Sequence, residues 1–214
     1  MGRENKKEAV AALHREQIMN AAEALFSENG FKTTTIEDIS KVSKYGRRTI
    51  YAYYKSKDDI LHHIIEKGLL LLKSEIEAAI QTNNDFISKY KAICLAMVKY
   101  QTECPHSLGN VTKAKTENLN FESLSDTVKR ILVLGTEINE LLAAFIEDGK
   151  KKNIIRQDVV PMITVYILWS SITSLITLAQ TKGQFISKQS SISENEFLDY
   201  GFKQLINSIL EERI

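Results

Sequence analysis

The first 104 residues contain no proline, and this absence limits the possible folds more than any other feature of the chain. A proline inside a helix removes a backbone hydrogen bond and clashes with the preceding turn, so a proline-free segment rich in Ala, Leu, Ile, Glu and Lys favours helices. Apolar residues make up 43% of the 214 residues, which is enough to bury a core. The sequence therefore predicts an all-α protein.

Composition also indicates where the protein works and what it does not do. The two cysteines are too few for a disulfide-rich secreted scaffold, and the charged N-terminus has no apolar segment of a secretion signal behind it. The adjacent histidines His62 and His63 point to different helix faces, and the sequence has no metal-binding, phosphate-binding or nucleophile motif. We expect a cytoplasmic protein that is not an enzyme, with no catalytic residue, metal or cofactor.

Positive charge is concentrated near the N-terminus. Residues 1–57 carry 11 Lys and Arg against 7 Asp and Glu, a net charge of +4, whereas residues 58–214 carry 17 against 20, a net charge of −3. A basic cluster is typical of a polyanion-binding surface, although a solvated positive face would have the same composition. The segment 41–57 holds no acid and six cations, which are Lys41, Lys44, Arg47, Arg48, Lys55 and Lys57.

Three helices and then a long fourth one are predicted for the N-terminal part. Apolar residues follow helical spacing over 8–29, and Gly30 suits the left-handed position just after a helix end. Thr35 with Asp38, and Ser56 with Asp59, have the spacing of capping boxes that open helices. The expected helices are 8–29, 36–43, 47–54 and one that begins near Ser56, around a core that includes Ile18, Phe26, Ile39 and Ile50.

The second and third of these helices have the dimensions of a helix-turn-helix motif. Arg47 and Arg48 fall in the first turn of the third helix, where cations oppose the helix dipole. A phosphate or a guanine edge as partner would explain them, because arginine binds guanine O6 and N7 together and the first residues of a recognition helix reach base edges. Among the tyrosines that follow, Tyr54 is expected to pack in the core.

Residues 18–60 resemble the DNA-binding domain of the tetracycline-repressor (TetR) family of bacterial transcriptional regulators. The family pattern is a first helix ending in Leu-Phe, then Gly-Phe, Thr-Thr, Asp-Ile-Ala, a turn, Thr-Leu-Tyr-x-Tyr-Phe and Ser-Lys-Glu. The resemblance implies two domains, 1–57 for DNA binding and 58–214 for ligand binding and dimerisation. The matching residues here are Leu25-Phe26, Gly30-Phe31, Thr34-Thr35, Asp38-Ile39-Ser40, Thr49-Ile50-Tyr51-Ala52-Tyr53-Tyr54 and Ser56-Lys57-Asp58.

By this resemblance, Tyr51 and Lys57 would contact DNA phosphates, and residues 46–48 would begin the recognition helix. Thr35 would cap the second helix near the DNA backbone. Three positions depart from the family pattern, with Lys44 at the usual turn glycine, Tyr45 at the following valine and Gly46 at a common serine. The expected DNA-binding residues are Thr35, Lys44, Tyr45, Gly46, Arg47, Arg48, Tyr51, Tyr53 and Lys57.

The C-terminal part has helical spacing but no motif of comparable specificity. Asp158 is expected to cap the helix that follows it. The other expected elements are helices over 86–103, 122–152 and 194–212, an irregular link over 105–120 and a serine-rich link over 187–193.

Residues 159–181 form a run of 23 uncharged residues, which is long enough to cross a bilayer. Serine, threonine and glutamine side chains make this run semipolar, which favours a buried helix over a membrane span. In the TetR family, the last two long helices form a four-helix dimer bundle with their symmetry mates. The resemblance therefore implies a dimer interface with Ile167, Ser171, Ser174, Phe197 and Leu205.

These features together predict a ligand-responsive repressor that binds a pseudo-palindromic operator in double-stranded DNA as a homodimer. A mostly apolar small molecule would bind in the C-terminal domain, tilt the fourth helix and change the spacing of the two DNA-binding heads. Two alternatives stay open, a helical carrier of an apolar molecule and a regulator tethered to the membrane by residues 159–181. The expected ligand-binding residues are Leu69, Met97, Tyr100, Phe145, Tyr166, Trp169 and Thr173.

Overall fold

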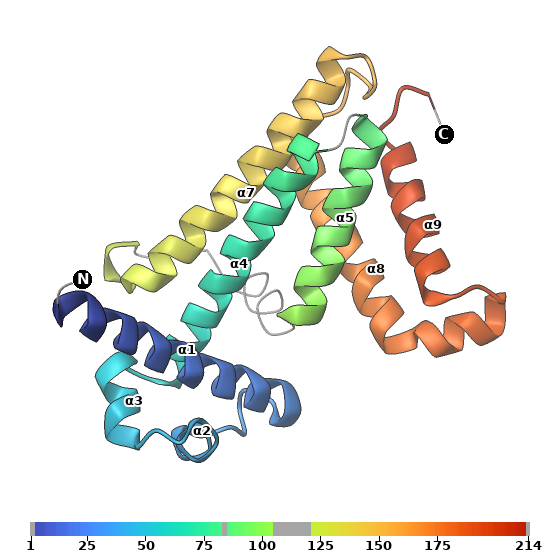
Figure 1. Ribbon diagram of the computed structural model, residues 1–214. Coiled ribbons are helices and arrows are strands. Elements are labelled where there is room, and N and C mark those ends of the chain that lie inside the picture. Colours follow the sequence, from blue (N-terminus) through green and yellow to red (C-terminus); the bar gives the residue numbers. More distant parts are fainter. Residues whose placement is uncertain (1–2, 83–84, 105–120, 213–214) are drawn as a thin grey trace. The chain divides into compact units, whose positions relative to one another are not determined.

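The computed structural model describes residues 3–82, 85–104 and 121–212 of the chain. Within these ranges the protein is built from helices, and the β-type pairing is limited to one isolated bridge between Ile155 and Leu210. The predicted all-α fold is therefore confirmed (Figure 1). The link predicted over 105–120 lies outside the described residues.

The four N-terminal helices begin and end close to where the sequence predicts, except that the first begins five residues earlier, at Arg3 rather than at residue 8. Gly30 has a φ of 83°, and its backbone N–H donates to the carbonyl of Phe26 at 3.0 Å, so it ends the first helix as expected. Thr35 and Asp38 form the predicted capping box. The helices are α1 (Arg3–Asn29), α2 (Ile36–Ser43), α3 (Arg47–Tyr53) and α4 (Lys57–Thr82).

The C-terminal helices differ from the sequence-based prediction mainly at their ends. Asp158 does not cap the helix after it, because that helix begins at Pro161 with Val160 as N-cap, and Asp158 instead pairs with Arg156 at 3.2 Å. The same helix runs to Ser190, through most of the predicted serine-rich link. The elements are α5 (Phe86–Glu103), a 3-10 turn η1 (Phe121–Ser123), α7 (Asp126–Lys151), α8 (Pro161–Ser190) and α9 (Glu194–Asn207).

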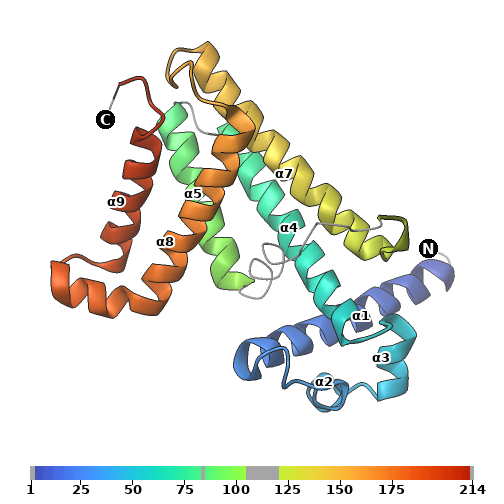
Figure 2. The same ribbon diagram turned by 180° about the vertical axis from the view of Figure 1, so that it is seen from behind.

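The chain divides into two compact units, one within residues 1–69 and 104–132 and the other within 70–103 and 133–214. Helices α4 and α7 each contribute residues to both units. The core of the first unit includes the four residues predicted for it, Ile18, Phe26, Ile39 and Ile50, which are all fully buried. In the second unit, α8 packs against both α5 and α9 (Figure 2).

Helix α8 is long and apolar enough to cross a membrane, and 28% of its most apolar window is buried inside the protein. The expectation that residues 159–181 form a buried helix is therefore met on one face only. Ile172 and Ile176 are buried, whereas Ile163, Tyr166 and Ile167 are each 58% exposed. A helix with one apolar face inside and another outside is typical of a partner-binding surface.

Candidate functional sites

Helix α3 presents an exposed basic face at its first turn. Arg47 and Arg48 are exposed, and no hydrogen bond or ion pair of either guanidinium to the described residues is recorded. Tyr51, one turn later, is 56% exposed, and Lys44 in the preceding turn is exposed as well. We call Lys44, Arg47, Arg48 and Tyr51 the recognition face.

The turn before α3 holds this face in a defined position. Lys44 has a φ of 62°, a left-handed conformation that glycine adopts more easily. The Ser40 hydroxyl of α2 donates to the carbonyl of Tyr45 at 2.7 Å and so fastens the turn to the preceding helix. Gly46 is the N-cap of α3, and no side-chain hydrogen bond caps this helix.

Two residues that are predicted to bind DNA, Tyr45 and Tyr53, also pack against α1. The Tyr45 ring lies 4.8 Å from the His14 ring, and its hydroxyl donates to Gln17 Oε1. The Tyr53 hydroxyl lies 3.1 Å from His14 Nδ1, and the Arg15 guanidinium lies over the Tyr53 ring. Both tyrosines are half-buried, so their visible role is to support α3 rather than to reach outward.

Lys57 also has an internal role that differs from the expected phosphate contact. Its ammonium donates to the carbonyls of Phe31 and Thr34 at 2.6 Å each, and a weaker contact of 3.4 Å reaches the carbonyl of Lys32. The same ammonium lies 4.4 Å from the centre of the Phe31 ring. The first residue of α4 thus fastens the loop between α1 and α2, because its three N–H groups match three carbonyls.

Thr35 and Tyr54 occupy the positions that the sequence predicts. The exposed Thr35 caps α2, and its backbone N–H and hydroxyl both donate to Asp38, which lowers the pKa of that carboxyl. Tyr54 is a core residue with 1% exposure, and its hydroxyl donates to the carbonyl of Arg15 at 3.0 Å. Burial raises the pKa of Tyr54 to about 12, so it stays neutral at physiological pH.

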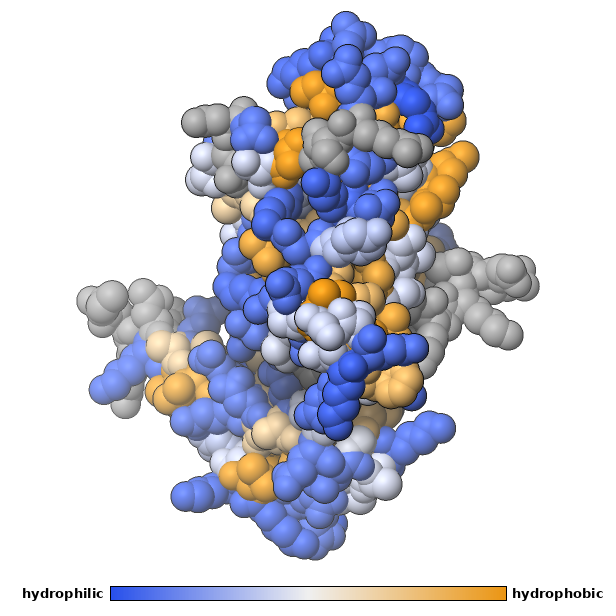
Figure 3. All heavy atoms as spheres, turned by 90° about the vertical axis from the view of Figure 1, so that its right-hand side faces the viewer, coloured by the Kyte–Doolittle hydropathy of each residue, from blue (hydrophilic) through white to orange (hydrophobic). Residues whose placement is uncertain are grey.

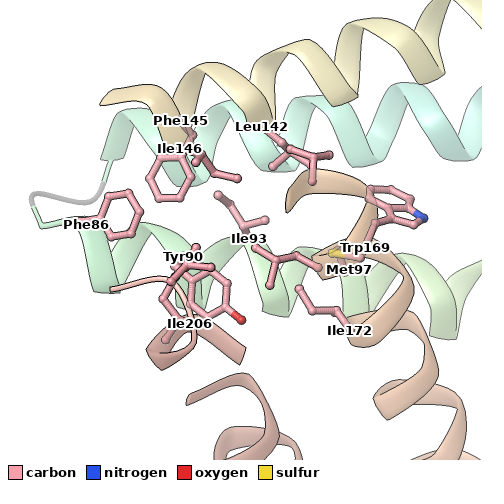
Figure 4. Close-up of a pocket in the computed structure, with 13 residues that line it drawn as sticks. Phe86, Tyr90, Ile93, Met97, Leu142, Phe145, Ile146, Trp169, Ile172 and Ile206 are labelled. Atoms are coloured by element: carbon pink, nitrogen blue, oxygen red, sulfur yellow. The ribbon is translucent and has the colours of Figure 1, made fainter. Parts of the chain in front are cut away.

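The second unit contains an apolar cavity between α5, α7, α8 and α9 (Figure 4). The Phe86 and Phe145 rings stack at one end with a centroid separation of 4.4 Å, while Met97, Trp169 and Ile172 lie at the other. The free volume is about 30 Å³, far below the several hundred Å³ of a typical ligand pocket, so a ligand has to displace lining side chains. The lining residues are Phe86, Tyr90, Ile93, Met97, Leu142, Phe145, Ile146, Val165, Leu168, Trp169, Ile172, Ile206 and Ile209.

Three of the seven predicted ligand-binding residues line this cavity: Met97, Phe145 and Trp169. Four do not. Tyr166 is 58% exposed, because it follows the lining residue Val165 by one position and so lies on a different helix face. The buried Leu69 belongs to the first compact unit and does not reach the cavity.

The remaining two predicted ligand-binding residues, Tyr100 and Thr173, lie one helical turn from the wall residues Met97 and Trp169 without lining the cavity. The sequence analysis also missed Ile93 and Tyr90. Their spacing of four and seven residues from Met97 would have placed them on the same stripe of α5.

The predicted dimer-interface residues lie on α8 and α9 and are at least partly exposed. Ser171, Ser174 and Leu205 line a shallow groove between the two helices, and Ile167 is 58% exposed. A Cβ at Gly201 would come within 2.8 Å of Leu175, so the two helices approach closely beneath the groove. Apolar side chains reach the surface on the face that carries α9 (Figure 3). Phe197 is half-buried and does not line the groove.

Comparison with known proteins identifies the N-terminal region. Residues 18–64 match the family model described as bacterial regulatory proteins, tetR family. The chain is 42% identical over 67 residues to the HTH-type transcriptional regulator HbdR of Aromatoleum sp. (strain CIB), a match that covers 31% of this chain and 29% of HbdR. It is also 28% identical over 148 residues to the HTH-type transcriptional repressor NicS of Pseudomonas putida, covering 68% and 67% of the two chains.

A similarity to solved structures extends over most of the chain. The fatty acid degradation regulator FadR from Bacillus halodurans superposes with a TM-score of 0.67 at 19% identity, covering 90% of this chain and 94% of that one. At this identity the match concerns the fold. The matched family consists of regulatory proteins, which agrees with the expectation that the chain is not an enzyme.

Lys57→Ala should lower the free energy of unfolding by about 1–3 kcal/mol, because it leaves loop carbonyls without their charged donor. Urea denaturation measures the change. Lys55→Ala is the matched control, since the Lys55 side chain is exposed, and its effect should stay within about 0.5 kcal/mol. Equal effects of the two substitutions would contradict the internal role of Lys57.

Proposed function

Because the chain belongs to the tetR family of bacterial regulatory proteins, we propose that it binds an operator through α3 as a homodimer and that a small molecule in the second unit controls the binding. The chain spans 29% of HbdR and 67% of NicS, so these activities are proposals for the whole protein. The repressor role follows NicS, which carries that name.

The recognition face provides the main support for the proposal that the protein binds DNA. Two arginines in the first turn of a helix oppose the helix dipole, and neither has a recorded partner among the described residues that would offset the cost. Their rigid support by α1 and the turn favours a defined docking position over a flexible charge cluster. A guanine edge or a phosphate in a major groove provides the missing partner.

The exposed face of α8 and α9 supports the homodimer. It combines large apolar side chains such as Ile163 and Ile167 with a groove lined by Ser171 and Ser174, whose small side chains allow close approach of another helix. A second copy can cover such a face through a two-fold axis, because the same surface then serves both partners. A dimer interface on this face would explain why residues 159–181 carry no charge, so no membrane span is needed to explain them. We therefore propose that the protein lies in the cytoplasm.

Helix α7 offers a route from the cavity to the DNA-binding unit. Leu142, Phe145 and Ile146 of α7 line the cavity, whereas no described residue of α4 does. Two ion pairs connect α7 to α4, Lys73 with Glu137 at 2.8 Å and Arg130 with Glu66, where Nη2 lies 3.0 Å from Oε2. A ligand that displaces α7 would therefore move α4, and α4 begins directly after the recognition helix. Such a ligand favours the conformation that does not fit the operator.

The alternative of a plain carrier of apolar molecules uses the same cavity but gives no role to the recognition face. Titration with DNA at several salt concentrations separates the two functions, because a carrier would show no dependence on phosphate contacts.

Arg48→Ala should weaken binding to the cognate operator by about 1–3 kcal/mol and relax the preference at one base pair of each half-site. The loss should be smaller on random DNA, since a base contact exists only on the cognate site. Lys67→Ala is the control. It also removes one positive charge, but Lys67 is paired with Glu16 of α1 at 3.9 Å and lies outside the recognition face, so both DNA affinities should stay unchanged. An equal loss on both DNAs would show that Arg48 contacts phosphate alone.

Ser174→Glu should convert the dimer into monomers, because it places a charge in the proposed interface, where no basic residue lines the groove. Sedimentation velocity measures the oligomeric state, and operator affinity should fall by about 100-fold or more as the two heads bind separately. Ser74→Glu adds the same charge at an exposed position of α4 and should leave the dimer intact. A dimeric Ser174→Glu variant would place the interface elsewhere.

A further inference from the structure

The wall of the cavity offers a ligand no charge. All of its lining residues are uncharged, and the hydroxyl of Tyr90 donates to the carbonyl of Phe202 at 3.0 Å, which uses its proton. Burying a charged group without a partner costs several kcal/mol. An ionised carboxylate or amine would therefore have no counter-charge inside this cavity.

Two buried oxygens belong to residues that follow the wall residues Met97 and Trp169 along α5 and α8. Gln101 Oε1 on α5 and Thr173 Oγ1 on α8 are buried and have no recorded hydrogen-bond partner among the described residues. Gln101 follows Met97 by four positions, and Thr173 follows Trp169 by four, so each lies one helical turn along the face of a wall residue. Met97 and Trp169 lie together at the same end of the cavity (Figure 4).

A chain of hydrogen bonds determines which side-chain atom of Gln101 has no hydrogen-bond partner within the described part of the chain. Gln101 Nε2 donates to Thr177 Oγ1 at 2.7 Å, and the Thr177 hydroxyl donates to the carbonyl of Thr173 at 2.9 Å. Because the Thr177 proton is used, the Gln101 nitrogen has to face Thr177 and its oxygen becomes a spare acceptor. A buried polar group without a partner destabilises a protein, so a ligand that satisfies both oxygens gains affinity.

We propose that the effector is an uncharged molecule with an apolar body and one terminal hydroxyl, which donates to Gln101 Oε1 and accepts from the Thr173 hydroxyl. The apolar body occupies the cavity between Phe86 and Trp169. This inference rests on the proposed function only in calling the molecule an effector, since the binding itself can be measured without DNA.

The experiment compares three probes with the same octyl chain, 1-octanol, methyl octyl ether and nonanoate, by the shift of the unfolding temperature of the full chain. The alcohol should bind about five- to tenfold more tightly than the ether or the carboxylate, the difference expected for one hydrogen bond to a buried acceptor. Thr173→Val, which replaces the hydroxyl by a methyl group of similar size, should lower the affinity for the alcohol about five- to tenfold, because the alcohol oxygen loses its donor. Thr173→Ser should retain the affinity.

Thr181→Val is the matched control, because Thr181 lies on the same helix and its hydroxyl already donates to the carbonyl of Thr177 at 2.7 Å. It should leave the affinity for the alcohol unchanged. If Thr173→Val does not fold, Thr173→Ala is measured in its place. Equal binding of the three probes, binding of none of them, or an affinity for the alcohol that survives the loss of the Thr173 hydroxyl would each overturn the inference.

Operator titration in the presence of 1-octanol separates this inference from the proposed function. If the alcohol is preferred and operator affinity does not change, the ligand site stands and the proposed regulation fails. If the alcohol is not preferred and the operator is still bound, the inference fails and DNA binding stands.

Discussion

The packing of α3 against α1 is the interaction on which the DNA-binding unit depends. Ile50 is fully buried and Tyr54, just after α3, reaches back to the carbonyl of Arg15, so the rotation of α3 about its axis is fixed. With that rotation fixed, Arg47 and Arg48 have to point outward. Tyr45 and Tyr53 pack against His14 of α1 and so hold the turn before α3 and α3 itself in place. The Lys57 ammonium fastens the loop between α1 and α2. The chain thus places two charges that have no partner among the described residues on a rigid support, which would reduce the entropy lost on binding a duplex.

The second unit depends on α8, which has two apolar faces. One face encloses the cavity with α5, α7 and α9, and the other is exposed. A second copy on the exposed face would hold α8 in place, so that a ligand could act on α7 rather than loosen the whole unit. Under the proposed mechanism, the dimer and the ligand response therefore depend on the same helix.

Local signals in the sequence predicted the N-terminal unit well, because its helix ends are set by neighbours within a few residues. The Gly30 stop and the capping box of Thr35 are both of this kind. The roles of Tyr45, Tyr53 and Lys57 were missed, since their partners His14 and Phe31 lie 26 or more residues away. In the second unit the lining residues come from four helices, so periodicity could mark apolar stripes but not which stripes meet. The end of α8 was missed because serine and glutamine are tolerated in an exposed helix.

Footprinting on the DNA that flanks the protein's own coding region would show whether the recognition face binds an operator as part of a dimer. We expect two protected half-sites whose centres are separated by about 34–36 Å or a multiple of that distance, corresponding to successive turns of the duplex. Protection should disappear when Arg47 and Arg48 are both replaced by alanine. Protection that persists in that variant, or an absence of protection by the unaltered protein, would rule out operator binding through this face.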